Sequence, residues 1–131
     1  LLKEVFSADY ADVTYNPVLK IGKVIWKGKA TSAEYQNTFT SLLDYADKYP
    51  VHYYLADVIN QSVVSPEDRK WFENIVIPSA IGKGLKKAGI VFVGNVFKKY
   101  YLNMILQVTN KLGLPLKLFY NDEDAIKWFL K

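Results

Sequence analysis

The sequence predicts an α/β domain in which helices pack on a mostly parallel central sheet. Three observations support this fold class. They are an opening pair of strand-like segments, a regular alternation of helical and strand-like segments after it, and a short apolar run at 88–94 bounded by glycine. Such a run is typical of a parallel strand buried on both faces. The predicted order is β-β-α-β-α-β-α-β-α, because strands joined through helices make right-handed crossovers into one sheet.

The strands are predicted from apolar, β-branched and aromatic runs that end at turn residues. They cover residues 9–16, 18–27, 51–58, 88–94 and 116–120. The turn signal Asn16-Pro17 joins the first two, so they are expected to pair as a hairpin. Gly22 interrupts the alternation of the second strand, which favours a bulge there.

The helices are predicted from apolar stripes at helical spacing and from residues typical of helix ends. They cover residues 31–48, 66–81, 97–112 and a last segment capped by 121–124. Thr31 and Glu34 form a capping box at the first start. Ser65 followed by Pro66 is a strong start for the second helix. Pro78 is expected to kink or end that helix.

Composition favours one domain, residues 1–131, with a core of its own. Half of the residues are hydrophobic and 15% are aromatic, and there is no cysteine, so disulfides and thiolate metal sites are excluded. No apolar run approaches the ~20 residues that span a bilayer. The opening segment, residues 1–6, is too short and too charged for a signal peptide. We therefore expect a cytoplasmic protein without a transmembrane segment.

The net charge of +4 is mild, and the lysines that produce it are typical of a solvated surface. The chain contains one arginine, Arg69, although arginine is the usual residue for bidentate contacts to phosphates and bases. Nucleic acid is therefore not the expected partner.

No set of catalytic residues is recognisable in the sequence. His52 is the only histidine, and it begins a strand, at the end opposite the predicted polar rim. A Ser-His-Asp arrangement or a histidine metal site would need His52 and partners that the sequence does not place beside it. Gly82-Lys83-Gly84 lacks the spacing of a phosphate loop. We expect no catalytic residues, no metal and no cofactor.

Polar residues follow the predicted strand ends, where open α/β sheets bind their ligands. The candidate rim for a ligand or partner consists of Asp57, Asn60, Ser62, Ser65 and Asn95. Ser62 and Ser65 are also candidate phosphorylation sites. A phosphate on Ser65 would lie near the positive end of a helix, although two neighbouring acids would repel it.

Several apolar side chains fall outside the expected buried stripes of the second and third helices. They are Ile77, Ile81, Tyr100, Leu102 and Leu106. A wide buried face would account for them. The alternatives are an exposed patch for a protein partner or for self-association, or the lining of a lipid-like pocket.

The order and spacing of four segments carry a resemblance to a known family. The segments are 25–35, 55–71, 88–93 and 119–130. Together they resemble the STAS domain in its SpoIIAA-like branch, which also carries a STAS/SEC14 label. The resemblance implies a STAS-like α/β fold and regulated protein–protein contact without catalysis.

In anti-sigma-factor antagonists of this fold, a phosphorylated Ser or Thr follows an aspartate at a strand end. Asp57 matches that aspartate, but Val58-Ile59-Asn60-Gln61 departs from the expected pattern. The sequence therefore predicts a non-catalytic regulatory or protein-interaction module, with a binder of a small apolar or amphipathic ligand as the alternative.

Overall fold

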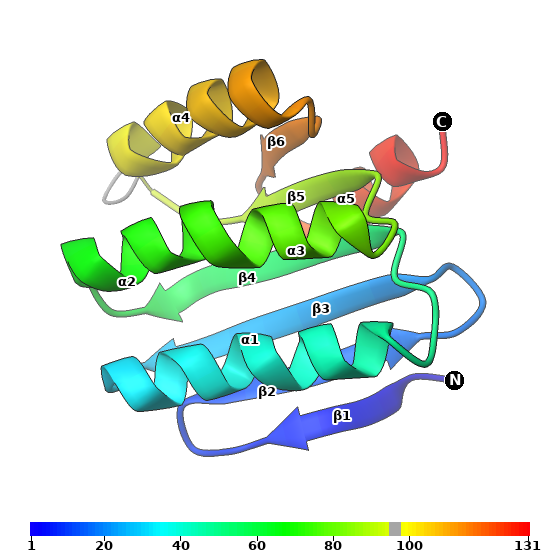
Figure 1. Cartoon of the computed structure of the whole chain (residues 1–131), viewed down its shortest axis with the longest axis horizontal. Helices are drawn as coiled ribbons and strands as arrows, with labels where there is room; N and C mark the ends of the chain where they lie inside the picture. The colour runs from blue at the N-terminus through cyan, green and yellow to red at the C-terminus, as the bar shows by residue number, and fades with distance from the viewer. Residues whose placement is uncertain (95–97) are drawn as a thin grey trace.

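The computed structural model describes residues 1–94 and 98–131, which form a six-stranded sheet covered by helices (Figure 1). The strands lie in sequence order: β1 (Lys3–Ser7), β2 (Ala11–Asn16), β3 (Ile21–Gly28), β4 (Tyr53–Gln61), β5 (Lys87–Val91) and β6 (Leu116–Phe119). Strands β1 to β3 pair antiparallel, and β3 to β6 pair parallel. The predicted α/β fold class is confirmed.

Two details of the strands differ from the prediction. Strand β1 was not predicted, because it is a short edge strand without a fully buried residue and its pairing shifts between Glu4 and Phe6. The predicted bulge at Gly22 is wrong, because Gly22 pairs regularly with Tyr15. A Cβ at Gly22 would lie 2.9 Å from Leu42 Cδ1, so the glycine leaves room for a helix to pack.

The helical segments follow the prediction closely. They are α1 (Ser32–Ala46), α2 (Pro66–Trp71), the π-helical segment η1 (Phe72–Val76), α3 (Ile77–Gly82), α4 (Lys98–Gln107), the π-helical segment η2 (Val108–Leu112) and α5 (Asp122–Phe129). The capping box of Thr31 and Glu34 is present, and Ser65 and Asn121 cap α2 and α5.

Pro78 does not end its helix. The segments α2, η1 and α3 run on from one another, and Pro78 lies in the first turn of α3. A proline inside a helix lacks the N–H for the usual i−4 bond. Just before Pro78, the N–H of Ile77 donates to the carbonyl of Phe72, five residues back. The wider π turn therefore precedes the proline and the helix continues through it.

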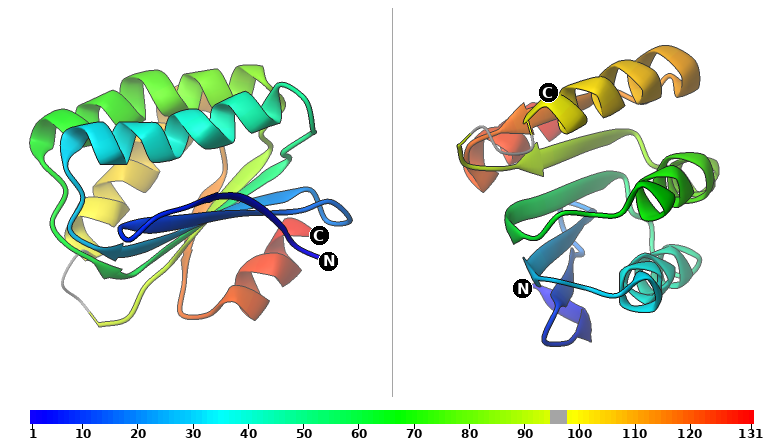
Figure 2. Two further views of the ribbon diagram at one scale, coloured as in Figure 1. Left: turned by 90° about the horizontal axis from the view of Figure 1, so that it is seen from below. Right: turned by 90° about the vertical axis from the view of Figure 1, so that its left-hand side faces the viewer.

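The helices divide unequally between the two faces of the sheet. Figure 2 shows α1, α2 and α3 on one face and α5 on the other. The larger core lies under α1, η1, α3 and α4 and contains Trp26, Phe39, Phe72 and Met104. The smaller core lies under α5 and joins Leu55, Val91 and Phe129. Because strand residues alternate between faces, the neighbours Leu55 and Ala56 of β4 belong to different cores.

Candidate functional site

The larger core contains an apolar cavity between the sheet and the helices, which we call the inner cavity. Its volume is about 70 Å³. The residues that line it and matter below are Ala56, Tyr35, Tyr54, Gln61, Tyr101 and Met104. An apolar cavity of about 150 Å³ is large enough to hold benzene in another protein. The inner cavity is about half that size, so it has room for the last two or three carbon atoms of an aliphatic chain, and the rest of a longer chain must extend out of it.

Two tyrosine hydroxyl groups of the inner cavity form no hydrogen bond with any side chain or backbone group that the structure describes. They belong to Tyr35 on α1 and Tyr54 on β4, which both line the cavity. Burial raises the pKa of both phenols well above the usual 10.0. No described side-chain N or O that is fully buried lacks a hydrogen-bond partner, so these two hydroxyl oxygens are accessible from the cavity or from solvent. An apolar cavity with a few polar groups that a ligand can reach is typical of a small-molecule site.

A third tyrosine of the cavity is paired. The Tyr101 hydroxyl donates to Oε1 of Gln61 over 2.9 Å, which joins α4 to the end of β4. This bond leaves the amide N–H groups of Gln61 available as donors. Burial raises the pKa of Tyr101 as well, so this phenol stays neutral at physiological pH.

The π-helical segment η1 forms part of the wall of the inner cavity. Phe72 and Val76 of η1 line the cavity, and the Phe72 ring lies 4.8 Å from that of Phe39 on α1. A π turn widens a helix and displaces the side chains that follow it. Such turns are frequent at functional sites, which agrees with a cavity at this place.

A second cavity, with a mixed polar and apolar wall, lies where β3 and β4 end and α1 and α2 begin, and we call it the outer cavity. Its volume is about 160 Å³. It shares Trp26, Tyr35, Gln61 and Val64 with the inner cavity, so the two adjoin. The other polar residues of its wall are Lys29, Ser32, Ser62, Ser65 and Asp68.

Asp68 is the buried acid of the outer cavity, with 6% of its surface exposed. Its Oδ2 accepts a hydrogen bond of 2.9 Å from the hydroxyl of Ser32 at the start of α1. Its backbone N–H donates to the hydroxyl of Ser65, the cap of α2. Asp68 therefore links the starts of two helices, and its negative charge is favourable near their positive ends.

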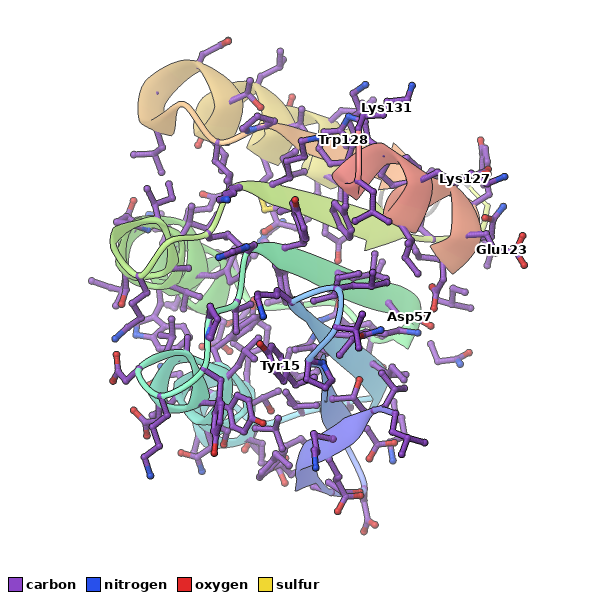
Figure 3. The ribbon with its side chains drawn as sticks, turned by 90° about the vertical axis from the view of Figure 1, so that its right-hand side faces the viewer. Tyr15, Asp57, Glu123, Lys127, Trp128 and Lys131 are labelled. Carbon is purple, nitrogen blue, oxygen red and sulfur yellow. The ribbon has the colours of Figure 1, made fainter. Side chains whose placement is uncertain are left out.

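The structure separates the residues of the predicted rim. Ser62 and Ser65 line the outer cavity. Asp57 lies within β4, which continues to Gln61, and Figure 3 shows it on the side of the sheet where α5 lies. Its Oδ1 accepts a bond of 3.1 Å from the backbone N–H of Ile59. Asn60 is exposed at the end of β4, while Asn95 lies outside the described residues.

The surplus apolar residues also separate into two groups. Ile77 and Tyr100 line the inner cavity, and Ile81 packs at the edge of the larger core. Leu102 and Leu106 of α4 are 44% and 59% exposed. Phe97, which the sequence placed on the same helix, lies outside the described residues. A cavity lining and an exposed surface therefore both occur.

Sequence reasoning missed Tyr35, Tyr54, Tyr101 and Asp68 as site residues. A signal for Tyr54 existed: it places a polar hydroxyl on a face of a central strand whose next two members are Ala56 and Val58. Asp68 was interpreted only as an acid near a helix start, because no local pattern shows that its side chain meets Ser32.

The described part of the chain offers neither a metal site of the usual kind nor a membrane-spanning helix. No three His, Asp or Glu side chains there lie close enough together to hold a metal ion. None of its helices combines the length and the apolar character needed to cross a membrane.

Comparison with solved structures identifies the fold as SpoIIAA-like. One similar structure is an uncharacterized protein of the DUF3478 family, with a SpoIIAA-like fold, from Shewanella loihica PV-4. The match has a TM-score of 0.58 and 21% identity, and it covers 98% of this chain and 92% of that one. The fold that the sequence resemblance implied is thereby confirmed. No protein-family model and no curated protein matches the chain.

Proposed function

We propose that this domain is a non-catalytic binding module for a short amphipathic molecule, whose apolar part occupies the inner cavity. The observation that carries this proposal is an apolar cavity lined by Tyr35 and Tyr54, whose hydroxyls bond to no described residue and stay accessible to a ligand. Small-molecule sites are typically apolar pockets with a few converging polar groups. Under the same proposal, the protein acts in the cytoplasm.

The size of the two cavities supports an amphipathic ligand over a purely apolar one. The inner cavity offers about 70 Å³ with an apolar wall, and the outer one about 160 Å³ with a wall that is half polar and half apolar. A molecule with a short chain and a polar head would bury both parts among groups of matching polarity. Burial of the chain supplies roughly 0.8 kcal/mol for each CH₂ group.

The test fills the inner cavity and measures the binding of hexan-1-ol by isothermal titration calorimetry. Ala56 is buried and lines the inner cavity, so Ala56→Leu should occupy its free volume and weaken binding by about tenfold or more. Ala33→Leu makes the same change at an exposed position of α1 that lines neither cavity, and it should bind like the wild type. No saturable binding by the wild type, or equal affinities for all three proteins, would refute the proposal.

A second candidate function, contact with a protein partner or with another copy of the chain, is favoured by the exposed side chains of Leu102 and Leu106. They lie one turn apart on α4, so they form one small apolar surface. The double change of both residues to serine should abolish self-association in light scattering and should leave the fold intact. A wild type that is already monomeric and a pull-down that is unchanged by the double variant would contradict this function.

Phosphorylation at Ser62 or Ser65 remains a prediction. The two serines differ in their surroundings: Ser62 is exposed, whereas the Ser65 hydroxyl accepts a hydrogen bond from the backbone N–H of Asp68. Phosphorylation of Ser65 would place new negative charge beside Asp68 and close the outer cavity to an anion. Mass spectrometry of the protein from its native cell tests it, and both serines always unmodified would contradict it.

A further inference from the structure

The outer cavity has the chemistry to select the polar head of the ligand, an inference that rests on the proposed function. A ligand chain in the inner cavity leads its head past Tyr35 and Gln61, which line both cavities. The head then meets Asp68, the only acidic residue among the described residues that line the outer cavity.

Asp68 has an unused hydrogen-bond acceptor. Its Oδ2 is bonded to Ser32, but Oδ1 has no partner in the described part of the chain. No lysine or arginine that the structure describes forms an ion pair with it, since the ion pairs join Lys23 to Asp122, Lys27 to Asp12 and Lys83 to Asp47. No fully buried oxygen of the described residues lacks a partner, so Oδ1 is accessible and can accept a hydrogen bond from a ligand.

The opposite charge at this site is weaker. Lys29 also lines the outer cavity, but its side chain is exposed to water, where an attraction to an anion is screened. The positive starts of α1 and α2 also favour an anion, and the carboxylate of Asp68 already offsets them. An anionic head inside the cavity would lie beside the buried charge of Asp68, and repulsion between buried like charges costs several kcal/mol.

We infer that the outer cavity binds a head group that donates hydrogen bonds, a hydroxyl or an ammonium group, and rejects a carboxylate. Asp68 Oδ1 accepts from the head, and the free N–H groups of Gln61 orient an oxygen of the head when it has one. The ligand class is therefore a short-chain alcohol or amine.

The experiment compares three probes with the same chain, hexan-1-ol, hexylamine and hexanoate, by titration calorimetry at pH 7. The alcohol or the amine should bind about tenfold or more tightly than hexanoate. A clear preference for hexylamine would identify an ammonium head, and equal affinities of alcohol and amine a hydroxyl-type site. Hexanoate binding as tightly as the better of the other two would overturn the inference.

Variants of charged residues separate the head-group site from the inner cavity. Asp68→Asn should weaken the binding of hexylamine by about tenfold and strengthen the binding of hexanoate, because the carboxylate charge is removed. Glu67→Gln removes the same charge from an exposed neighbour that lines neither cavity, and it should change nothing. Lys29→Gln should leave the order of the three binding affinities unchanged. Because Lys29 is exposed, this variant tests the site without the folding defect that a change at Asp68 could cause. If Lys29→Gln lowers the affinity for hexanoate tenfold, the outer cavity is an anion site instead.

The two proposals fail in different ways. If none of the probes binds, the proposed function fails. If all three bind equally and Ala56→Leu still blocks them, the inner cavity is a binding site and the inference about the head group fails.

Discussion

The adjacent tyrosines of β4 show how differently the two faces of the sheet are packed. Tyr53 faces α5, and its ring stacks on Phe129 with centroids 5.1 Å apart and planes inclined by 12°. Tyr54 faces the other helices, lines the inner cavity and has a hydroxyl without a partner in the described residues. One residue along the strand therefore separates a filled core from an unfilled one.

The packing around Gly89 confirms that the α5 face is filled. A Cβ at Gly89 would lie 3.2 Å from Phe129, 3.3 Å from Phe119 and 3.4 Å from Leu55. Protein interiors are normally packed to this density, and a void costs the contacts that its lining atoms lose. The α5 face therefore stabilises the fold fully. The other face lacks some packing contacts around the inner cavity, and a bound ligand would make those contacts.

The largest expected effect comes from shortening one buried side chain on each face. Leu55→Ala removes a side chain that is 1% exposed from the filled core and should cost about 3 to 5 kcal/mol. Met104→Ala, also almost fully buried, enlarges a cavity whose lining already lacks contacts, and it should cost about 2 kcal/mol. Urea unfolding measures both, and equal losses would show that the two faces are packed alike.

The next test adds a methyl group to each face. Gly89→Ala places a Cβ within 3.2 and 3.3 Å of the bulky rings of Phe129 and Phe119 in a filled core, so a loss of about 1 to 3 kcal/mol is expected. Gly22→Ala meets Leu42 at 2.9 Å and Val51 at 3.1 Å, but both side chains line the inner cavity, into which their ends are expected to shift. Its free energy of unfolding should change by less than about 1 kcal/mol.

Thermal unfolding of the two glycine variants decides this point. If Gly22→Ala is the more damaging change, as its shorter distance alone would suggest, then the inner cavity gives Leu42 no room to move. Weaker binding of hexan-1-ol by Gly22→Ala would show directly that Leu42 has entered the cavity.

A smaller effect separates the two kinds of tyrosine within the cavity wall. Tyr101→Phe breaks the bond to Gln61 and should cost about 1 kcal/mol. Tyr54→Phe removes a hydroxyl that bonds to no described residue, so stability should be unchanged or slightly higher. Tyr54→Phe should nevertheless weaken the binding of ligands that hydrogen-bond to the Tyr54 hydroxyl. A loss of stability in Tyr54→Phe as large as in Tyr101→Phe would contradict the assignment.

The sequence predicted the helices and strands of both faces better than it predicted the cavities between them. Hydrophobic periodicity and helix caps depend on local chemistry, so α1, its capping box and the glycine-bounded strand β5 could be anticipated. Strand β1 could not, because an edge strand with one irregular pairing lacks a clear alternation.

The candidate site shows where local patterns stop being informative. The rule that ligands bind beyond the strand ends led to Ser62 and Ser65, which do line the outer cavity. It also led to Asp57, which lies inside β4 because that strand continues three residues beyond Val58. A helical stripe identifies which residues face inward, but only the distance between helix and sheet decides whether they touch. Ile77 therefore lines a cavity, whereas Leu102 is exposed.

The smallest expected effect is a pH dependence on the loosely packed side, at Glu73 of η1. Burial raises the pKa of this carboxyl above its usual 4.5, although Arg69 and Lys111 oppose the shift. The folded state then binds the proton more tightly than the unfolded chain does. The stability that Glu73 contributes is therefore present below the unfolded pKa and is lost as the pH rises through the folded one.

Glu73→Gln should accordingly raise the melting temperature slightly at pH 7 and by less at pH 4. Glu4→Gln on the exposed edge strand is the control for the change in net charge. If Glu73→Gln lowers the melting temperature at pH 7, attraction to Arg69 and Lys111 outweighs burial, and η1 is held in place by charge. Because η1 lines the inner cavity, that outcome would mean that charge pairing, and not only apolar contact, keeps the helix over the cavity.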